Sequence, residues 1–461
     1  MKGERAIETI RSFDFRFVTP IHLTLRAAGP YGATMKRIFA STLTLCSLLL
    51  PCARASAFTS DGFLARYLPS GALDTSFSGD GILTTGHPGL DRIDGAHVLS
   101  DGKVLVGVNV VSVDQQQETF VIARYNANGT SDTTFGYGGI TTYTTSPSSA
   151  IMEVATDSSG RIVATLYDPS TGKLRLVRFN ATGVLDSSWT IQVIQFPTLP
   201  ALHALSTYVN PSGGATVGVR FGNDFKVIRY QSNGQLDFGF GIFGIQTLAG
   251  SGELNAIMVD GAGKTFIAGN TLPNTRSDFT LRALNSNGTV DNTFSFMTPF
   301  VFLTNGFSYL MSAARDGNGS FLLAGAALNT DGPVSFVLTR NLSNGSVDSG
   351  FNGGLGFTTT SFAGSIRSHA LSVAPILSGG QSGKTVVVGI AYDNPEDVTV
   401  GGPSGRLAMA RYTSAGALDT SFDGDGKVVT NFGTGRVWRS AARIADSTGK
   451  VLAYGSLAWE E

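Results

Sequence analysis

A short segment recurs seven times along this chain, and that repetition limits the possible folds more than any other feature of the sequence. Each copy holds an arginine, a glycine, an aspartate and an aromatic residue in the same order. A unit that returns so often is expected to form the same structural element each time, packed against its neighbours in the sequence. The copies are ARYLPSGALDTSF (65–77), ARYNANGTSDTTF (123–135), VRFNATGVLDSSW (177–189), IRYQSNGQLDFGF (228–240), LRALNSNGTVDNTF (281–294), TRNLSNGSVDSGF (339–351) and ARYTSAGALDTSF (410–422).

Three of the four repeated positions carry side chains that can hold a structure together. The arginines are Arg66, Arg124, Arg178, Arg229, Arg282, Arg340 and Arg411. The aspartates are Asp74, Asp132, Asp186, Asp237, Asp291, Asp348 and Asp419. The aromatic residues are Phe77, Phe135, Trp189, Phe240, Phe294, Phe351 and Phe422. Since every unit needs them alike, we interpret them as a network that holds each turn and its neighbour in register; the alternative is seven equivalent ligand sites.

A second segment also recurs seven times, and it fixes the secondary structure of the unit. It consists of a glycine turn followed by an apolar strand, as in DGKVLVG (101–107) and SGKTVVVG (382–389), with another short apolar strand before it. One unit therefore contains four strands joined by turns, which predicts a four-stranded antiparallel blade. The repeated aspartates lie 58, 54, 51, 54, 57 and 71 residues apart. Four strands in a unit of this length predict an all-β, seven-bladed β-propeller.

The order of the half-units predicts how the ring closes. The repeat region begins with the second half of a unit (62–85) and ends with a first half (436–458). We expect the strand near Val451 to pair with the strand near Ala65, so that the two ends share one composite blade. Such a pairing would leave no open sheet edge at the seam.

The N-terminal region has the layout of a secretory leader. Basic residues at 35–37 precede an apolar run at 38–51 and the small residues ARASA at 53–57. This order predicts a signal peptide over 35–57, cleaved after Ala55 or Ala57, while 1–34 is an extended or non-native segment and 58–461 the propeller domain. A retained anchor and a lipoprotein signal at Cys52 are alternatives. Cleavage would leave no cysteine, because Cys46 and Cys52 both lie in the leader.

Composition narrows the classes of partner. The net charge is -1 and charged residues make up 15% of the chain, so no basic surplus is present to neutralise phosphates. We therefore expect no nucleic-acid partner, and no membrane span in the mature chain. A protein or carbohydrate ligand is expected, outside the cell or in the periplasm.

A few polar residues fall on the strand that should line the central channel. They are Glu153, His203, Asn255 and His369, and near the channel mouth such side chains could bind a ligand or a metal ion. The alternative is ordinary water-facing channel residues. No cofactor is predicted. Asp-Gly-Asp-Gly at 423–426 and Ser-Gly-Asp-Gly at 78–81 resemble fragments of calcium loops, and a polar hairpin turn is the alternative.

Two segments carry a family resemblance. ALDTSFSGDG (72–81) and ALDTSFDGDG (417–426), with Ala-Arg-Tyr before them, resemble the delta-60 repeat family of bacterial exported proteins. The resemblance extends over residues 62–456, although Ala283 and Asn341 stand where other copies have an aromatic residue. It implies an extracytoplasmic, propeller-like protein and no catalytic residues.

Three functions are compatible with these patterns. The first is a non-catalytic binding scaffold at the cell surface or in the periplasm. The second is a metal-assisted hydrolase or lactonase that uses the channel residues. The third is a purely structural surface protein. No catalytic motif is present: Lys264 and Lys384 follow glycine as in a phosphate-binding loop, but a strand follows where that loop requires a helix.

Overall fold

The computed structural model describes residues 59–85, 90–111, 118–143, 150–168, 171–196, 203–221, 224–248, 253–270, 279–296, 307–328, 334–393, 405–433, 435–444 and 446–459. All of them belong to one compact unit of the chain, Ala57–Glu461. The segment 1–34 and the predicted signal peptide at 35–57, with both cysteines, lie outside the described residues.

Four repeat units form separate sheets in which consecutive strands pair antiparallel. Among the described residues one of these sheets has three strands and the others four. A 3-10 turn, η1 (Asn352–Gly354), precedes β21. The strands are β7 (Ala150–Thr156), β8 (Ile162–Asp168), β9 (Lys173–Phe179) and β10 (Val193–Gln195); β11 (His203–Val209), β12 (Ala215–Phe221), β13 (Asp224–Tyr230) and β14 (Ile245–Leu248); β15 (Glu253–Val259), β16 (Thr265–Asn270) and β17 (Phe279–Leu284); and β18 (Phe307–Arg315), β19 (Phe321–Leu328), β20 (Ser335–Asn341) and β21 (Phe357–Thr360).

The remaining strands form a 12-stranded sheet made of three groups. Single residue pairs, Gly405 with Val437 and Ser60 with Leu90, connect the outer groups to the middle one. The groups are β22 (Arg367–Pro375), β23 (Thr385–Tyr392), β24 (Gly405–Tyr412) and β25 (Lys427–Thr430); β26 (Arg436–Ile444), β27 (Val451–Trp459), β1 (Thr59–Tyr67) and β2 (Ile82–Thr84); and β3 (Leu90–Val98), β4 (Val104–Val111), β5 (Glu118–Tyr125) and β6 (Ile140–Tyr143).

The middle group combines strands from the two ends of the described chain. β1 and β27 pair antiparallel along their whole length, from Thr59 opposite Trp459 to Tyr67 opposite Val451. β26 then pairs with β27, and β2 with β1. The four strands therefore have the order of one repeat unit, although β1 and β2 come from a different part of the sequence than β26 and β27.

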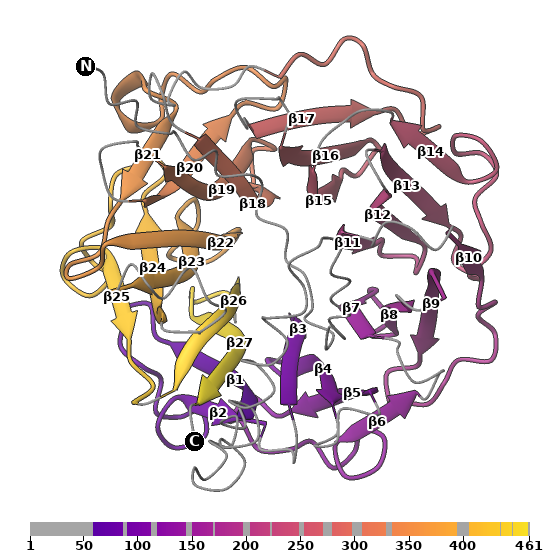
Figure 1. Cartoon of the computed structure of the whole chain (residues 1–461), viewed down its shortest axis with the longest axis horizontal. Helices are drawn as coiled ribbons and strands as arrows, with labels where there is room; N and C mark the ends of the chain where they lie inside the picture. Colours follow the sequence, from indigo (N-terminus) through magenta and orange to yellow (C-terminus); the bar gives the residue numbers. More distant parts are fainter. Residues whose placement is uncertain are drawn as a thin grey trace, which may run out of the picture. The chain divides into compact units, whose positions relative to one another are not determined.

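The sheets follow one another in chain order around a common centre (Figure 1). The first strand of each unit lies nearest that centre, and we call β3, β7, β11, β15, β18, β22 and β26 the inner strands. Apolar side chains fill the space between neighbouring sheets. For example, Phe135, which follows β5, is fully buried in a cluster with Ile162 and Val177 of the next sheet. The prediction of an all-β fold built mostly of four-stranded antiparallel sheets is confirmed.

The repeated glycine is required by the turn that follows the third strand. Gly129 has a φ of 87°, a left-handed conformation that residues with a Cβ rarely adopt. Its N–H donates to the Asn126 carbonyl at 2.9 Å and closes the turn. The chain then folds back, and the N–H of Asp132 donates to the carbonyl of Arg124 at 2.9 Å. This geometry brings the repeated arginine and aspartate side by side.

No helix among the described residues is long and apolar enough to cross a membrane.

Candidate functional site on the inner strands

Each inner strand contains a register shift against its second strand, and one position just beyond the shift faces the next sheet. We call this the junction position. In four sheets the side chain there accepts a hydrogen bond from a backbone N–H of the next inner strand, at 3.1–3.2 Å. The junction residues, in chain order, are Gly95, Glu153, Ser206, Ala256, Ser312, Ser372 and Ala441.

Glu153 occupies a junction position that three other sheets fill with serine. Its Oε2 accepts a hydrogen bond from the Thr207 N–H at 3.1 Å, so this carboxylate fastens β7 to β11. Burial raises the pKa of Glu153, an effect that the Arg443 charge and the hydrogen bond from Thr207 oppose. The channel residue predicted from the sequence therefore also has a structural contact, and one oxygen remains for another partner.

Arg443 of β26 supplies that partner and was not singled out by the sequence. Its guanidinium lies 3.6 Å from Oε1 of Glu153, beyond ordinary hydrogen-bond distance, and donates to the Ala442 carbonyl at 3.0 Å. It also lies 5.7 Å from the Tyr454 ring centre. A guanidinium has five N–H donors, so this one keeps donors that no described protein group accepts. Two residues beyond each junction, the other sheets carry His97, Ala155, Tyr208, Met258, Ala314 and Ala374. A departure of charge from the repeat is the signal that could have revealed Arg443.

His97 and Tyr454 lie beside Arg443 and Glu153. We call these four residues the inner cluster. Burial, and then the charge of Arg443, lowers the pKa of His97 to about 4, so its imidazole is neutral at pH 7. Burial raises the pKa of Tyr454, whose hydroxyl interacts with the backbone of Ala96. The inner cluster thus places one positive charge, one carboxyl group and two neutral polar rings on β26, β27, β3 and β7.

The other sequence candidates lie on different sheets. Asn255 accepts a hydrogen bond from the Asn270 amide at 3.3 Å, and that amide also donates to the carbonyl of Leu310 at 3.1 Å. His369 packs against Tyr392 with ring centres 5.5 Å apart, and burial followed by the Arg367 charge lowers its pKa to about 4. His203 pairs through its backbone with Arg220. No contact joins Glu153, Asn255 and His369 to one another.

No group of three His, Cys, Asp or Glu residues that could hold a metal ion occurs in the described part of the chain. The two fragments that resemble calcium loops are hairpin turns. Asp80 accepts the N–H of Ile82 at 2.8 Å, and Asp425 accepts the N–H of Lys427 at 2.9 Å.

The repeated arginine connects each sheet with the next. In six units its Nε lies 2.5–2.8 Å from the aspartate of the same unit, and its guanidinium lies 4.3–4.7 Å from the centre of the repeated aromatic ring. A further guanidinium N–H donates to a backbone carbonyl in the following unit. The acceptors are Ala127, Ala181, Ser232, Ser286, Ser414 and Pro69. In the remaining unit Asp291 pairs with Lys264.

The lysines that resembled phosphate-loop residues belong to the same network. Lys384 lies 2.8 Å from Asp419, and Lys264 binds Asp291, so each neutralises a repeated aspartate. Lys103 makes the equivalent pair with Asp132 at 2.9 Å.

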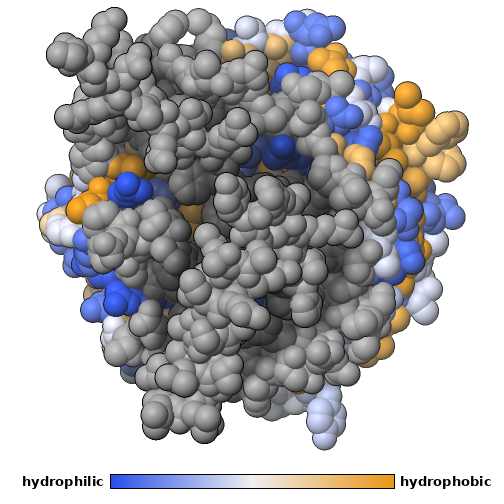
Figure 2. All heavy atoms as spheres, viewed as in Figure 1, coloured by the Kyte–Doolittle hydropathy of each residue, from blue (hydrophilic) through white to orange (hydrophobic). Residues whose placement is uncertain are grey.

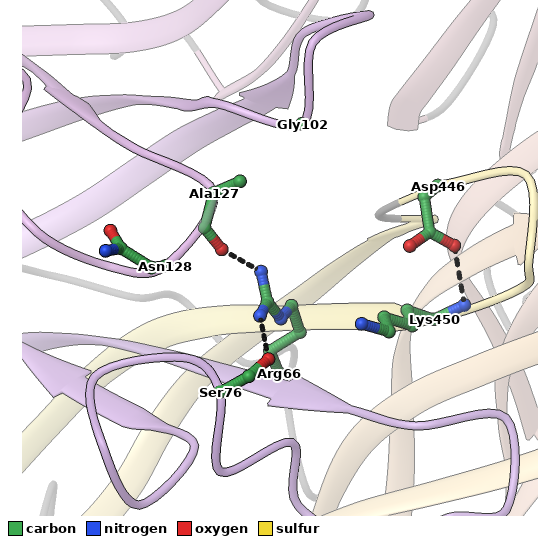
Figure 3. Close-up of a pocket in the computed structure, with 7 residues that line it drawn as sticks. All are labelled: Arg66, Ser76, Gly102, Ala127, Asn128, Asp446 and Lys450. Atoms are coloured by element: carbon green, nitrogen blue, oxygen red, sulfur yellow. Dashed lines mark hydrogen bonds between the residues drawn. The ribbon is translucent and has the colours of Figure 1, made fainter.

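A cavity of about 350 Å³ lies at the seam where the two ends of the chain meet. In Figure 3, Arg66 points to the Ala127 carbonyl and the Ser76 hydroxyl, while Lys450 lies beside Asp446. These charged groups already have protein partners, so the cavity offers fewer free donors than the inner cluster. Its lining residues are Arg66, Ser76, Gly102, Ala127, Asn128, Asp446 and Lys450.

Comparison with known proteins supports a β-propeller repeat protein. The sequence model of a family described as "Domain of unknown function (DUF5122) beta-propeller" matches residues 55–77, 99–135, 263–294 and 381–422. These segments hold four of the seven repeats found in the sequence. No curated protein sequence matches the chain.

The solved structures that match this chain share little sequence with it. A protein from Lactobacillus plantarum is 11% identical, with a TM-score of 0.45, covering 81% of this chain and 100% of its own. Sqt1 from Chaetomium thermophilum is 12% identical, with a TM-score of 0.42, and the match covers 86% of this chain and 100% of that chain. A quinonprotein alcohol dehydrogenase-like protein from Bacteroides thetaiotaomicron is 11% identical, with a TM-score of 0.38, and the match covers 80% of this chain and 77% of that chain. Such likenesses carry no information on what this chain binds.

Proposed function

We propose that this protein is an exported, seven-bladed β-propeller that acts as a non-catalytic binding scaffold, with the inner cluster as its ligand site. The ligand carries an anionic group that the Arg443 guanidinium binds. The observation that carries this proposal is the sparse hydrogen bonding of the Arg443 guanidinium. Its side chain is 36% exposed, it donates to the Ala442 carbonyl at 3.0 Å, and it pairs with Glu153 only at 3.6 Å, so donors remain for a ligand.

Ring closure is part of the proposal, because the inner cluster needs β26, β3 and β7 side by side. The pairing of β1 with β27 supports closure, as do contacts between successive inner strands, including β26 with β3. Seven repeat units in the sequence support the blade count, with β26, β27, β1 and β2 as the composite blade. The resemblance to delta-60 repeat proteins and the leader pattern at 35–57 support export.

The properties of the inner cluster favour binding of an anion over proton transfer at pH 7. His97 is neutral with a pKa of about 4, and Glu153 has a raised pKa. Oε2 of Glu153 already accepts the Thr207 N–H, and His97 carries no charge at pH 7, so the guanidinium of Arg443 is the group of the inner cluster that attracts an anion.

The test uses the full chain and two sugars that differ in one carboxylate, glucuronate and glucose. In a thermal-shift assay, the melting temperature should rise with increasing glucuronate and stay unchanged with glucose. Arg443→Gln should abolish the shift, whereas Arg436→Gln on the exposed end of the same strand should leave it unchanged. Equal shifts for the wild type and Arg443→Gln would refute an Arg443 site. No shift with any acidic sugar in a wider panel would favour a structural surface protein instead.

Export has its own measurement. N-terminal sequencing of protein recovered from the periplasm or medium of an expressing bacterium should begin at residue 56 or 58. Recovery of the intact chain from the cytoplasm alone would refute this part of the proposal.

A further inference from the structure

Three large apolar side chains project into solvent from the connection between β13 and β14. Phe238 is 69% exposed, Ile242 75% and Phe243 71%. The two phenylalanine rings lie edge to face, with centres 6.0 Å apart. In Figure 2 hydrophobic surface appears at the upper right, where Figure 1 places β13 and β14. We call residues 238–244 the apolar tip.

The apolar tip departs from the repeat at two positions. At the position of Phe238, every other unit has a small polar residue: Thr75, Thr133, Ser187, Asn292, Ser349 and Thr420. The glycine that follows Phe243 also occurs in other units. The residue before that glycine is Asp80, Gly138 or Asp425 in three of them, and Leu355 in the longer turn after η1. The fold therefore does not require aromatic residues at these positions.

The backbone at Phe243 is also unfavourable for a bulky residue. Phe243 has a φ of 53° and Gly244 a φ of 88°, which are the angles of a two-residue hairpin turn. The N–H of Ile242 donates to Ile245 at 2.8 Å and the reverse bond measures 3.1 Å, so the turn is well formed. Such a turn prefers asparagine or glycine, and Gly138 fills the same place elsewhere. Retaining strain for an exposed aromatic residue points to a function of the side chain.

The size and chemistry of the apolar tip indicate its occupant. Residues 238–244 contain no ionisable group, so a charged partner has nothing to pair with. Two aromatic side chains of about 150–250 Å² each, with one isoleucine, fall short of the roughly 800 Å² that each partner contributes to a stable protein interface. A bilayer surface imposes no such minimum area and accepts aromatic side chains at the headgroup level. We propose that the apolar tip inserts into the interfacial region of a lipid bilayer.

The experiment is co-sedimentation of the full chain with phosphatidylcholine vesicles at increasing lipid concentration. Phe243→Gly installs the residue of the equivalent turn, and Phe238→Thr installs the residue of three other units, so both variants should fold. Each should weaken partitioning by about 10-fold, because each removes one large apolar side chain from the membrane-bound state. Leu377→Ser, at another exposed apolar residue, should change nothing.

Phe243→Gly should also melt at or above the wild-type temperature, since it relieves the strained φ. Failure of the wild type to sediment with vesicles would overturn the proposal, as would equal binding by the wild type and both variants. A concentration-dependent dimer that Phe238→Thr disrupts would overturn it in favour of a contact between two copies. Arg443→Gln should bind vesicles normally, so loss of the inner-cluster ligand and loss of membrane binding are distinguishable.

Discussion

The Nζ atom of Lys450 lies 3.0 Å from Oδ2 of Asp74, although the two residues stand near opposite ends of the described chain. The same pair occurs within single units, between Lys103 and Asp132 at 2.9 Å and between Lys384 and Asp419 at 2.8 Å. The first and last half-units therefore hold the relative positions of the two halves of one unit. Asp74 at this seam also binds Arg66 at 2.7 Å, as the repeat requires.

Neutralising Asp74 should destabilise the protein strongly. Its side chain is 5% exposed and that of Arg66 9%, so Asp74→Asn leaves a buried guanidinium without its counter-charge. We expect a loss of about 3–5 kcal/mol in the free energy of unfolding, the usual effect of breaking a buried ion pair. Lys450→Met should cost no more than about 1 kcal/mol, because the lysine is partly exposed. Urea unfolding followed by circular dichroism measures both.

Asp132→Asn is the matched control within a continuous unit and should cost as much as Asp74→Asn. If Asp132→Asn is costly while Asp74→Asn is not, the seam does not contribute to stability as the internal sheets do.

Removal of residues 436–461 should prevent formation of a stable monomer. β1 would lose the strand that pairs with it from Thr59 to Tyr67, and Phe63, now fully buried, would become exposed at a sheet edge. We expect aggregation in size-exclusion chromatography and a lower melting temperature. A circular permutant that joins Trp459 to Thr59 and opens the chain between β14 and β15 keeps the pairing and should stay monomeric. Equal melting of the truncated and full chains would argue against a shared sheet.

The strand order of each unit could be predicted because it depends on local features. Glycine turns and alternating apolar residues lie within a few residues of one another, and their sevenfold return removes the ambiguity of any single copy. The pairing of the segments near Ala65 and Val451 followed from the order of half-units, and the structure pairs Ala65 with Ala453.

Apart from Glu153, the inner cluster could not be predicted, because it depends on contacts between sheets. Arg443 on β26 reaches Glu153 on β7 past β3, whose junction residue is Gly95 and has no side chain. A register shift between Val437 and Arg439 also changes which side chains of β26 face β3. Register shifts leave no reliable trace in a single sequence. Asn255 was predicted as a channel residue, but its link to Asn270 depends on the same kind of tertiary detail.

Stability should fall with pH in two steps. Burial lowers the pKa of His97 and of His369 from 6.5 to about 4, so the unfolded chain binds their protons more tightly than the folded chain does. Stability is therefore complete above about pH 6.5 and declines as the pH falls toward 4. Burial raises the pKa of Asp74, but the contacts with Ser76, Lys450 and Arg66 outweigh this effect and lower the pKa from 3.8 to about 2. The second loss of stability is therefore expected between pH 3.8 and about pH 2. Thermal melts from pH 8 to 2 measure both steps.

His97→Gln should reduce the upper step and leave the lower one intact. Glu153 has the opposite pH dependence, because its pKa is raised in the folded state and stability is lost as the pH rises through that pKa. Glu153→Gln should therefore remove this loss of stability at higher pH. A melting curve that stays flat from pH 6.5 to 4 in the wild type would contradict the assignment of the upper step to His97 and His369.

Two glycines with nearly equal backbone angles should respond differently to alanine. Gly79 has a φ of 89° and Gly129 a φ of 87°, so either substitution carries the left-handed cost of about 1–2 kcal/mol. A Cβ at Gly79 would meet nothing within 4 Å, whereas one at Gly129 would lie 2.9 Å from the Ser78 nitrogen. That nitrogen donates to the Asn128 carbonyl at 2.8 Å and joins two neighbouring sheets.

Gly129→Ala should therefore cost more than Gly79→Ala by at least about 1 kcal/mol, since it also pushes these sheets apart. Urea denaturation of the two variants beside the wild type measures the difference. Equal losses would show that the turn can shift without disturbing the junction, and that the repeated glycine serves only the backbone angle. A larger loss for Gly129→Ala would mean that the same residue also sets how closely one unit approaches the next, which explains why all seven copies keep it.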